Sequence, residues 1–97
     1  MKLTERERDV LSILDDSDLD SIALFVEKRL RMSEKELLEI LARLIDLNLA
    51  EKIAIPDDDG FGTIELFFRT KNVSKDMLND SLMYEAENSA KFGEKAK

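Results

Sequence analysis

Basic side chains at helical spacing are the residues of this chain whose type and position predict a chemical task. Lys28, Arg29 and Arg31 end one predicted helix, and Lys35 and Arg43 lie on the next. Lysine and arginine side chains grouped in this way bind phosphate or carboxylate. In the plainer interpretation, cations in a last helical turn complement the helix dipole, and Arg43 pairs with an acid on its own helix.

Acidic residues surround these cations and oppose binding to nucleic acid. In residues 33–48, Lys35 and Arg43 stand against four acids, and in residues 49–62 Lys52 stands against four. The formal net charge of −7 also repels phosphate at long range. The five basic residues above are therefore candidate contacts either to duplex DNA or to a protein, and the acidic surfaces suit a basic protein partner.

The residue inventory argues against catalysis. The chain has no Cys and no His, which excludes thiol nucleophiles, imidazole acid-base chemistry and the usual zinc sites. The run Asp57–Asp59 is best explained as a solvated turn, with a partner contact or a cation site as the alternatives. Gly60 and Gly62 lie in that same turn and do not form a phosphate-binding loop. We expect no enzyme, no cofactor, no metal site and no small-molecule substrate.

Helix-start signals and apolar spacing organise the first half of the chain. Thr4 with Glu7 and Ser33 with Glu36 are capping-box pairs, in which each side chain bonds the other residue's backbone amide. Asn48 tolerates the left-handed conformation that ends helices. With Ser17 or Asp18 as a further cap, apolar residues at three- and four-residue steps predict helices at about residues 5–15, 18–31 and 33–48.

The hydrophobic period changes from about 3.6 to 2 after Leu49. Apolar residues then alternate up to Pro56, and the turn-forming run 57–62 separates this segment from a β-rich segment at 63–70. The two segments predict a β-hairpin. With the three helices, this gives an α+β fold that is mostly α.

A last helix is expected at residues 74–92, with Ser74 as its cap and residues 93–97 as a frayed tail. Such a helix needs cover for its apolar face, either from its own domain or from the same helix of a second copy. The candidate dimer contacts are Met77, Leu78, Leu82, Tyr84 and Ala86.

Three helices followed directly by a hairpin resemble the winged-helix family, in which the hairpin is the wing. The resemblance covers residues 3–71, and its most telling segment is 32–52, where a "leucine, two residues, leucine" helix runs into a strand. The resemblance implies a DNA-binding regulator of transcription that recognises DNA with its third helix, and a homodimer joined through its end. Arg31 and Asn48 depart from the family, since many members have Gly at both places.

Length and hydropathy bound the remaining expectations. The 97 residues, of which 43% are hydrophobic, suffice for one core, so we expect one winged-helix domain at 1–73 joined to the C-terminal helix. The longest apolar stretches are much shorter than the roughly 20 residues that cross a bilayer. The charged N-terminal residues do not form a secretory signal, so we expect a cytoplasmic protein without membrane contact.

Overall fold

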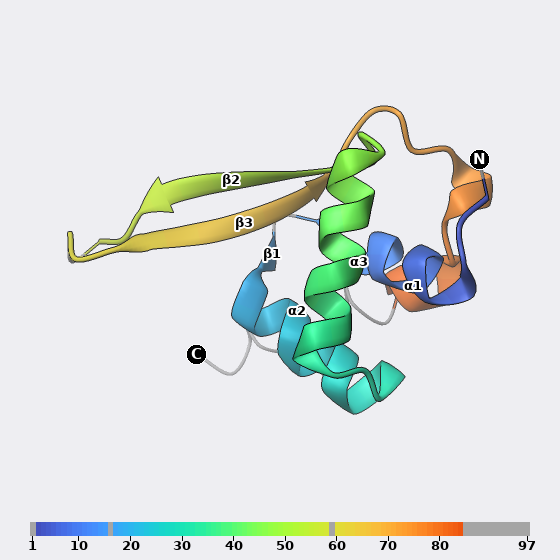
Figure 1. The fold of residues 1–97 in the computed structure, drawn as a ribbon, viewed down its shortest axis with the longest axis horizontal. Helices are drawn as coiled ribbons and strands as arrows, with labels where there is room; N and C mark the ends of the chain where they lie inside the picture. The colour runs from blue at the N-terminus through green and yellow to red at the C-terminus, as the bar shows by residue number, and fades with distance from the viewer. Residues whose placement is uncertain (1, 16, 59, 85–97) are drawn as a thin grey trace.

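In a computed structural model, the chain is described at residues 2–15, 17–58 and 60–84 (Figure 1). Along the chain the elements are α1 (Glu5–Ile13), β1 (Ser17–Asp18), α2 (Leu19–Phe25), the π-helical turn η1 (Val26–Leu30), α3 (Glu34–Asp46), β2 (Ala50–Pro56), β3 (Thr63–Arg69) and the 3-10 turn η2 (Lys75–Met77). The predicted α+β class, with three helices and a hairpin, is confirmed. The arrangement is compatible with a winged-helix-like fold.

The starts of α1 and α3 are fixed by side chains that bond backbone amides. At α1 the Thr4 hydroxyl accepts from the Glu7 amide (3.1 Å), and the Glu7 carboxylate accepts from the Thr4 amide (2.9 Å). This capping box was predicted. At α3 the Ser33 hydroxyl accepts from the Glu36 amide (3.2 Å), but the Glu36 carboxylate pairs with Arg6 instead of closing the box.

The end of α3 follows from one left-handed residue. Asn48 has φ 60°, a region where Asn is better tolerated than most residues. The Asn48 amide donates to the Ile45 carbonyl and the Leu49 amide donates to the Leu44 carbonyl, both at 3.0 Å. These two bonds are the Schellman pattern, and they direct the chain from the helix into β2.

Arg31 turns the chain between the second and third helices. It has φ 53° and ψ 45°, and the Arg31 and Met32 amides both donate to the Val26 carbonyl, which closes the wide turn η1. An Arg, and not Gly, thus occupies this left-handed position. Figure 1 shows α2 and α3 crossing at this turn.

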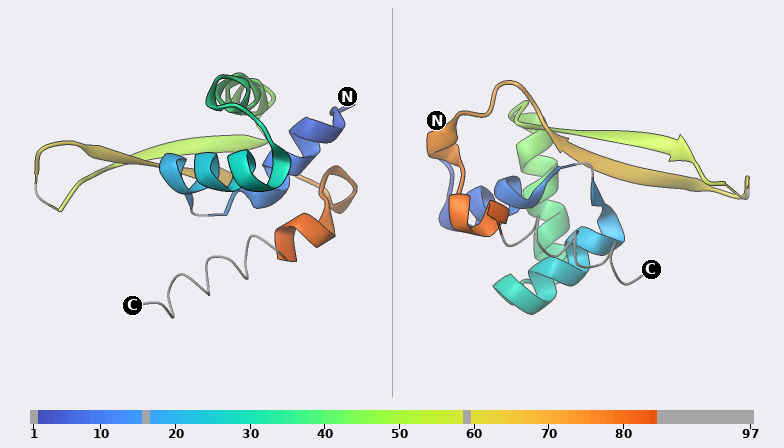
Figure 2. Two further views of the ribbon diagram at one scale, coloured as in Figure 1. Left: turned by 90° about the horizontal axis from the view of Figure 1, so that it is seen from below. Right: turned by 180° about the vertical axis from the view of Figure 1, so that it is seen from behind.

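The sheet has three antiparallel strands in the order β1-β3-β2. The hairpin pairs Ala50 with Arg69 at its base and Pro56 with Thr63 at its tip, and it projects away from the helices (Figures 1 and 2). In the turn, Gly60 adopts φ 77°, as the predicted turn chemistry requires. The two-residue strand β1 was not predicted, and it pairs with Phe67 and Leu66 of β3.

The hydrophobic core lies between the helices and the base of the hairpin. From the two hairpin strands it takes Ala50 and Phe67, among the described residues. The Arg69 guanidinium fastens the hairpin to α1, because it donates to the carbonyls of Ser12 (2.9 Å) and Leu11 (3.4 Å). The buried apolar residues are Val10, Leu11, Ile13, Leu14, Ile22, Val26, Met32, Leu37, Ile40, Leu41, Leu44, Leu49, Ala50, Phe67 and Leu82.

The prediction of one helix starting at Ser74 is wrong for the part of it that is described. Residues 75–77 form the short turn η2, Leu78 is extended (φ −114°, ψ 158°), and helical structure resumes at Asp80. The Ser74 hydroxyl does not cap a helix but donates to the Asp76 carboxylate. The break has a tertiary cause, since the Asn79 amide donates to the Ser12 hydroxyl of α1 (2.7 Å). Residues 85–92 of the predicted helix lie outside the described residues.

Candidate functional site

The outward face of α3 is the first surface that the fold presents to a partner. Leu37, Ile40, Leu41 and Leu44 are buried under it, which orients the helix. The exposed side chains of α3 are Glu34, Lys35, Leu38, Glu39, Ala42, Arg43 and Asp46. This face therefore carries two cations, three acids and two apolar residues.

Arg43, a predicted contact residue, is held at the side of α3 by α1. Its Nε pairs with a carboxylate oxygen of Glu7, whose side chain is only 7% exposed. Two helical turns away along the same side, Glu36 pairs with Arg6 (3.3 Å). The partner of Arg43 lies on a different helix, and not on its own helix as the sequence suggested. An arginine that is already paired with a buried carboxylate is less available to bind phosphate.

The remaining predicted cations lie in the segment 28–35, which runs from η1 into the first turn of α3. We call Lys28, Arg29, Arg31 and Lys35 the basic turn. All four side chains are exposed. Lys28, Arg31 and Lys35 form no ion pair with another described residue, whereas Arg29 does have an interaction. Four of the five predicted contact residues therefore lie at exposed positions of the segment 28–35, whereas Arg43 is paired with Glu7 of α1.

The hairpin, which we call the wing (residues 50–69), carries acids at its tip. The Asp58 amide donates to the Asp57 side chain (2.7 Å), and the Gly60 amide donates to the Asp57 carbonyl (3.0 Å), so Asp57 organises the turn. This agrees with the plain turn interpretation of the acidic run, of which Asp59 lies outside the described residues. Among the described residues, no group of three acids is placed to hold a metal ion.

One face of the wing is apolar, and sequence reasoning did not single it out. Directly paired residues of antiparallel strands share a face. The pairs Ile53 with Leu66 and Ile55 with Ile64 therefore lie side by side, with Phe68 next to them. The other face carries Phe67, which is buried, and the ion pair of Lys52 with Glu65 (3.2 Å). The signal was present in the sequence, because apolar residues recur at every second position in both strands.

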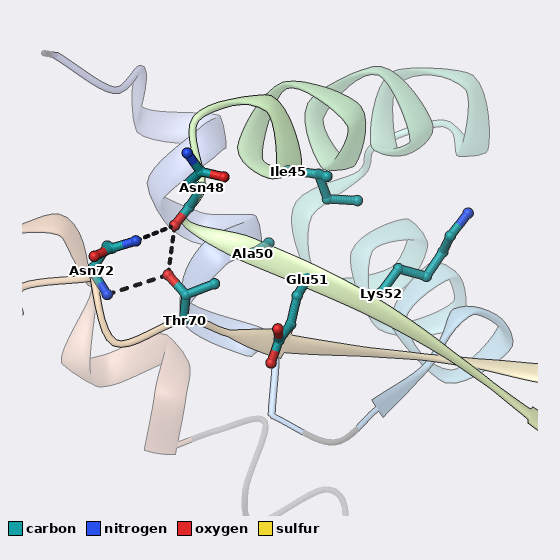
Figure 3. Close-up of a pocket in the computed structure, with 7 residues that line it drawn as sticks. All are labelled: Ile45, Asn48, Ala50, Glu51, Lys52, Thr70 and Asn72. Atoms are coloured by element: carbon teal, nitrogen blue, oxygen red, sulfur yellow. Dashed lines mark hydrogen bonds between the residues drawn. The ribbon is translucent and has the colours of Figure 1, made fainter.

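A shallow hollow of about 520 Å³ lies where α3 meets the base of the wing (Figure 3). Three of its polar residues, Asn48, Thr70 and Asn72, bond one another. The Asn48 carbonyl accepts from the Thr70 hydroxyl (2.6 Å) and from the Asn72 side-chain amide (3.0 Å), while the Asn72 amide donates to Thr70 (3.2 Å). These bonds fix the wing to α3, so we interpret the hollow as a structural junction.

The candidate dimer residues lie at the C-terminal end of the described chain. Leu82 is 6% exposed within the core, and Met77 and Leu78 pack against that core. Tyr84 is 68% exposed, and Ala86 lies outside the described residues. Both views of Figure 2 place the segment 78–84 beside α1. Leu78 and Leu82 are thus covered by their own domain.

Comparison with known proteins gives no match, so a functional proposal for this chain rests on the geometry described above. The chain matches no protein-family model, no curated protein and no solved structure. Among the described residues, no helix is long and apolar enough to span a membrane.

Proposed function

We propose that this chain is a non-enzymatic, winged-helix-type module that binds a basic protein through α3 and the wing. The observation that carries the proposal is the ion pair between Arg43 and Glu7. It neutralises the second cation of α3, although the Arg43 side chain stays 55% exposed. The remaining charges at exposed positions of α3 are then Glu34, Glu39 and Asp46 against Lys35.

The charge of the wing supports the same partner. Its tip carries Asp57 and Asp58, and its one Lys is neutralised by Glu65 on the neighbouring strand. Carboxylates placed against DNA forfeit counterion release and repel phosphate. Against a basic protein the same charges attract the partner over distance and accelerate association. The acidic surfaces and the net charge of −7 favour protein over DNA as the partner.

Charge reversal on α3 tests the proposal. The full chain would be immobilised and exposed to extract of its native cells at low salt, beside the variant Glu39→Lys/Asp46→Lys. We expect a stoichiometric partner that the variant no longer retains. The matched control is Asp20→Lys/Glu27→Lys, which makes the same charge change at exposed positions of α2 and η1. Equal retention by both variants, or no stoichiometric partner at all, would refute the proposal.

DNA binding is the second candidate, and the basic turn favours it. Lys28, Arg31 and Lys35 are exposed in the segment that leads into α3, and the start of this helix is the end that enters the major groove in helix-turn-helix proteins. A salt titration with duplex DNA decides this. If DNA is bound, log K falls as log salt rises. Arg31→Ala and Lys35→Ala should each make this negative slope shallower by about 1, and Arg43→Ala should leave it unchanged. No affinity at low salt would exclude this function.

A further inference from the structure

We propose that the apolar wing face, formed by Ile53, Ile55, Ile64, Leu66 and Phe68, is the docking surface for a basic amphipathic segment of another protein. The proposal rests on the function proposed above and assigns the part of the module that makes the central contact. Its starting observation is the register of the hairpin, which places these side chains on one side of two long strands.

The apolar wing face is not part of the core. None of its residues belongs to the packed core or lies against it, among the described residues, although Phe67 on the opposite face is 3% exposed. Ile53 and Ile55 are 44% and 39% exposed, while Ile64, Leu66 and Phe68 are half-buried. Isolated exposed apolar residues are ordinary, but adjacent ones on a projecting ribbon form a patch of the kind that marks interaction sites.

The fold also keeps this face accessible. Because the strand order is β1-β3-β2, β2 is an edge strand, and β1 covers β3 only at Phe67 and Leu66. Toward the tip the ribbon stands clear of the helices in both Figure 1 and Figure 2. A partner segment can therefore lie along the ribbon without displacing a described element.

The charges around the face identify the chemistry of the partner. Glu51 pairs with Phe68 and Asp18 pairs with Leu66, so both acids lie on the same side of the sheet as the apolar residues. Asp57 follows at the tip, where its side chain accepts the Asp58 amide. The cations of the wing are elsewhere, since Lys52 is on the opposite face with its ion pair and Arg69 is bonded to α1.

An apolar strip with an acidic rim fits a segment whose apolar side chains are flanked by Lys and Arg. A second copy of this chain fits poorly, because two-fold packing of this face on itself would bring like charges together. An anionic membrane surface or nucleic acid would meet the same repulsion. Charge therefore selects a basic amphipathic segment of another protein as the occupant.

The test uses the full, isotope-labelled chain and two synthetic helical peptides of about 18 residues, one of Leu and Lys and one in which Glu replaces each Lys. We expect the Leu/Lys peptide to cause saturable amide shifts in residues 51–55 and 64–68. The Leu/Glu peptide, with the same apolar face, should cause none at equal concentration. Equal binding of both peptides, or shifts centred on α3, would overturn the assignment.

Substitutions in the apolar wing face test which side chains bind the Leu/Lys peptide. Ile53→Ser/Leu66→Ser should weaken binding of the Leu/Lys peptide by about tenfold or more, as expected when central apolar anchors are removed. If the double variant does not fold, the single variant Ile55→Ser, closer to the tip, should also weaken binding of the Leu/Lys peptide. Leu24→Ser is the matched control, since Leu24 is 53% exposed on α2, outside the wing. An equal loss with Leu24→Ser would contradict the proposal.

Two outcomes separate this inference from the proposed function. If the native partner is still retained by Ile53→Ser/Leu66→Ser, the module binds protein but the wing face is not its docking surface. If the chain sediments as a dimer that Ile53→Ser/Leu66→Ser dissociates, the occupant is a second copy and the proposal fails. Loss of both the Leu/Lys peptide and the native partner in this variant supports the inference.

Discussion

Glu7 of α1 holds Arg43 of α3 with one carboxylate oxygen while the other accepts the backbone amide of Thr4 (2.9 Å). The two interactions make one nearly buried side chain responsible for the start of α1 and for its position against α3. The same contact also neutralises Arg43, one of the two cations of α3.

Replacing Glu7 by Ala should lower the free energy of unfolding by about 1–2 kcal/mol, because half of a capping box and an ion pair are lost together. Urea denaturation measures this. Glu5→Ala, which removes an exposed acid from the same first turn, is the control and should change stability by less than about 0.5 kcal/mol. Equal effects of the two substitutions would show that the Glu7 contacts contribute nothing.

Replacing Arg31 by Gly should raise the free energy of unfolding by about 0.5–1 kcal/mol. The left-handed conformation at φ 53° is strained for Arg and free for Gly, and this gain exceeds the extra chain entropy of Gly in the unfolded state. The matched substitution Ala42→Gly, at an exposed position inside α3, should lower stability by about 1 kcal/mol. Thermal unfolding of both variants checks the opposite signs, and a loss in Arg31→Gly would contradict the strain.

Local signals in the sequence predicted much of the helical frame. The capping box of Thr4 and Glu7 and the helix end at Asn48 are formed by bonds between residues close in sequence. Their roles therefore follow from residue type and spacing alone. The strand β1 escaped prediction because two residues, Ser17 and Asp18, are too short to display an alternating pattern. Their strand conformation comes from pairing with β3, which is remote in sequence.

The site was harder to predict, because its charges are redistributed by packing. Arg43 has acids within reach on its own helix, yet the approach of α1 to α3 offers it Glu7, and sequence spacing does not encode that approach. The break at Leu78 has a similar origin. Arg8 donates to the Leu78 carbonyl (3.4 Å) across 70 residues, so a tertiary contact overrides the helical pattern.

Replacing Ser12 by Ala should loosen the segment 78–84 from α1. The Ser12 hydroxyl donates to the Arg8 carbonyl and accepts from the Asn79 amide, both at 2.7 Å, so the variant leaves a partly buried amide without its acceptor. We expect a loss of about 1 kcal/mol and faster hydrogen exchange at Asn79. Ser21→Ala, at an exposed position of α2, is the control. Unchanged exchange at Asn79 would refute the anchoring role.

The hydrogen bond between Ser74 and Asp76 in the short turn η2 should make stability depend on pH. A hydrogen bond from Ser74 holds the pKa of Asp76 below its ordinary value of 3.8, with a bond to its own backbone adding to the effect. Because the folded-state pKa is lowered, this contact stabilises the fold above pH 3.8 and is lost as the pH falls through the lower folded value. Ser74→Ala should raise the pKa of Asp76 in a carboxyl NMR titration, while Ser74→Thr should not. An unchanged pKa in Ser74→Ala would contradict the hydrogen bond.

The C-terminal segment provides a test of whether its apolar residues cover their own domain or join two copies. Leu82 is 6% exposed in the core of a single chain, so Leu82→Ala should lower the free energy of unfolding by about 2–4 kcal/mol, equally at low and high protein concentration. Tyr84→Ser, at a side chain 68% exposed, should leave stability within about 0.5 kcal/mol. A two-fold dimer through this segment would behave differently, because association stabilises the folded state in proportion to the logarithm of concentration. An unfolding midpoint that rises with concentration, and loses that dependence in Tyr84→Ser, would establish the homodimer predicted from the sequence and would assign Tyr84 to its interface.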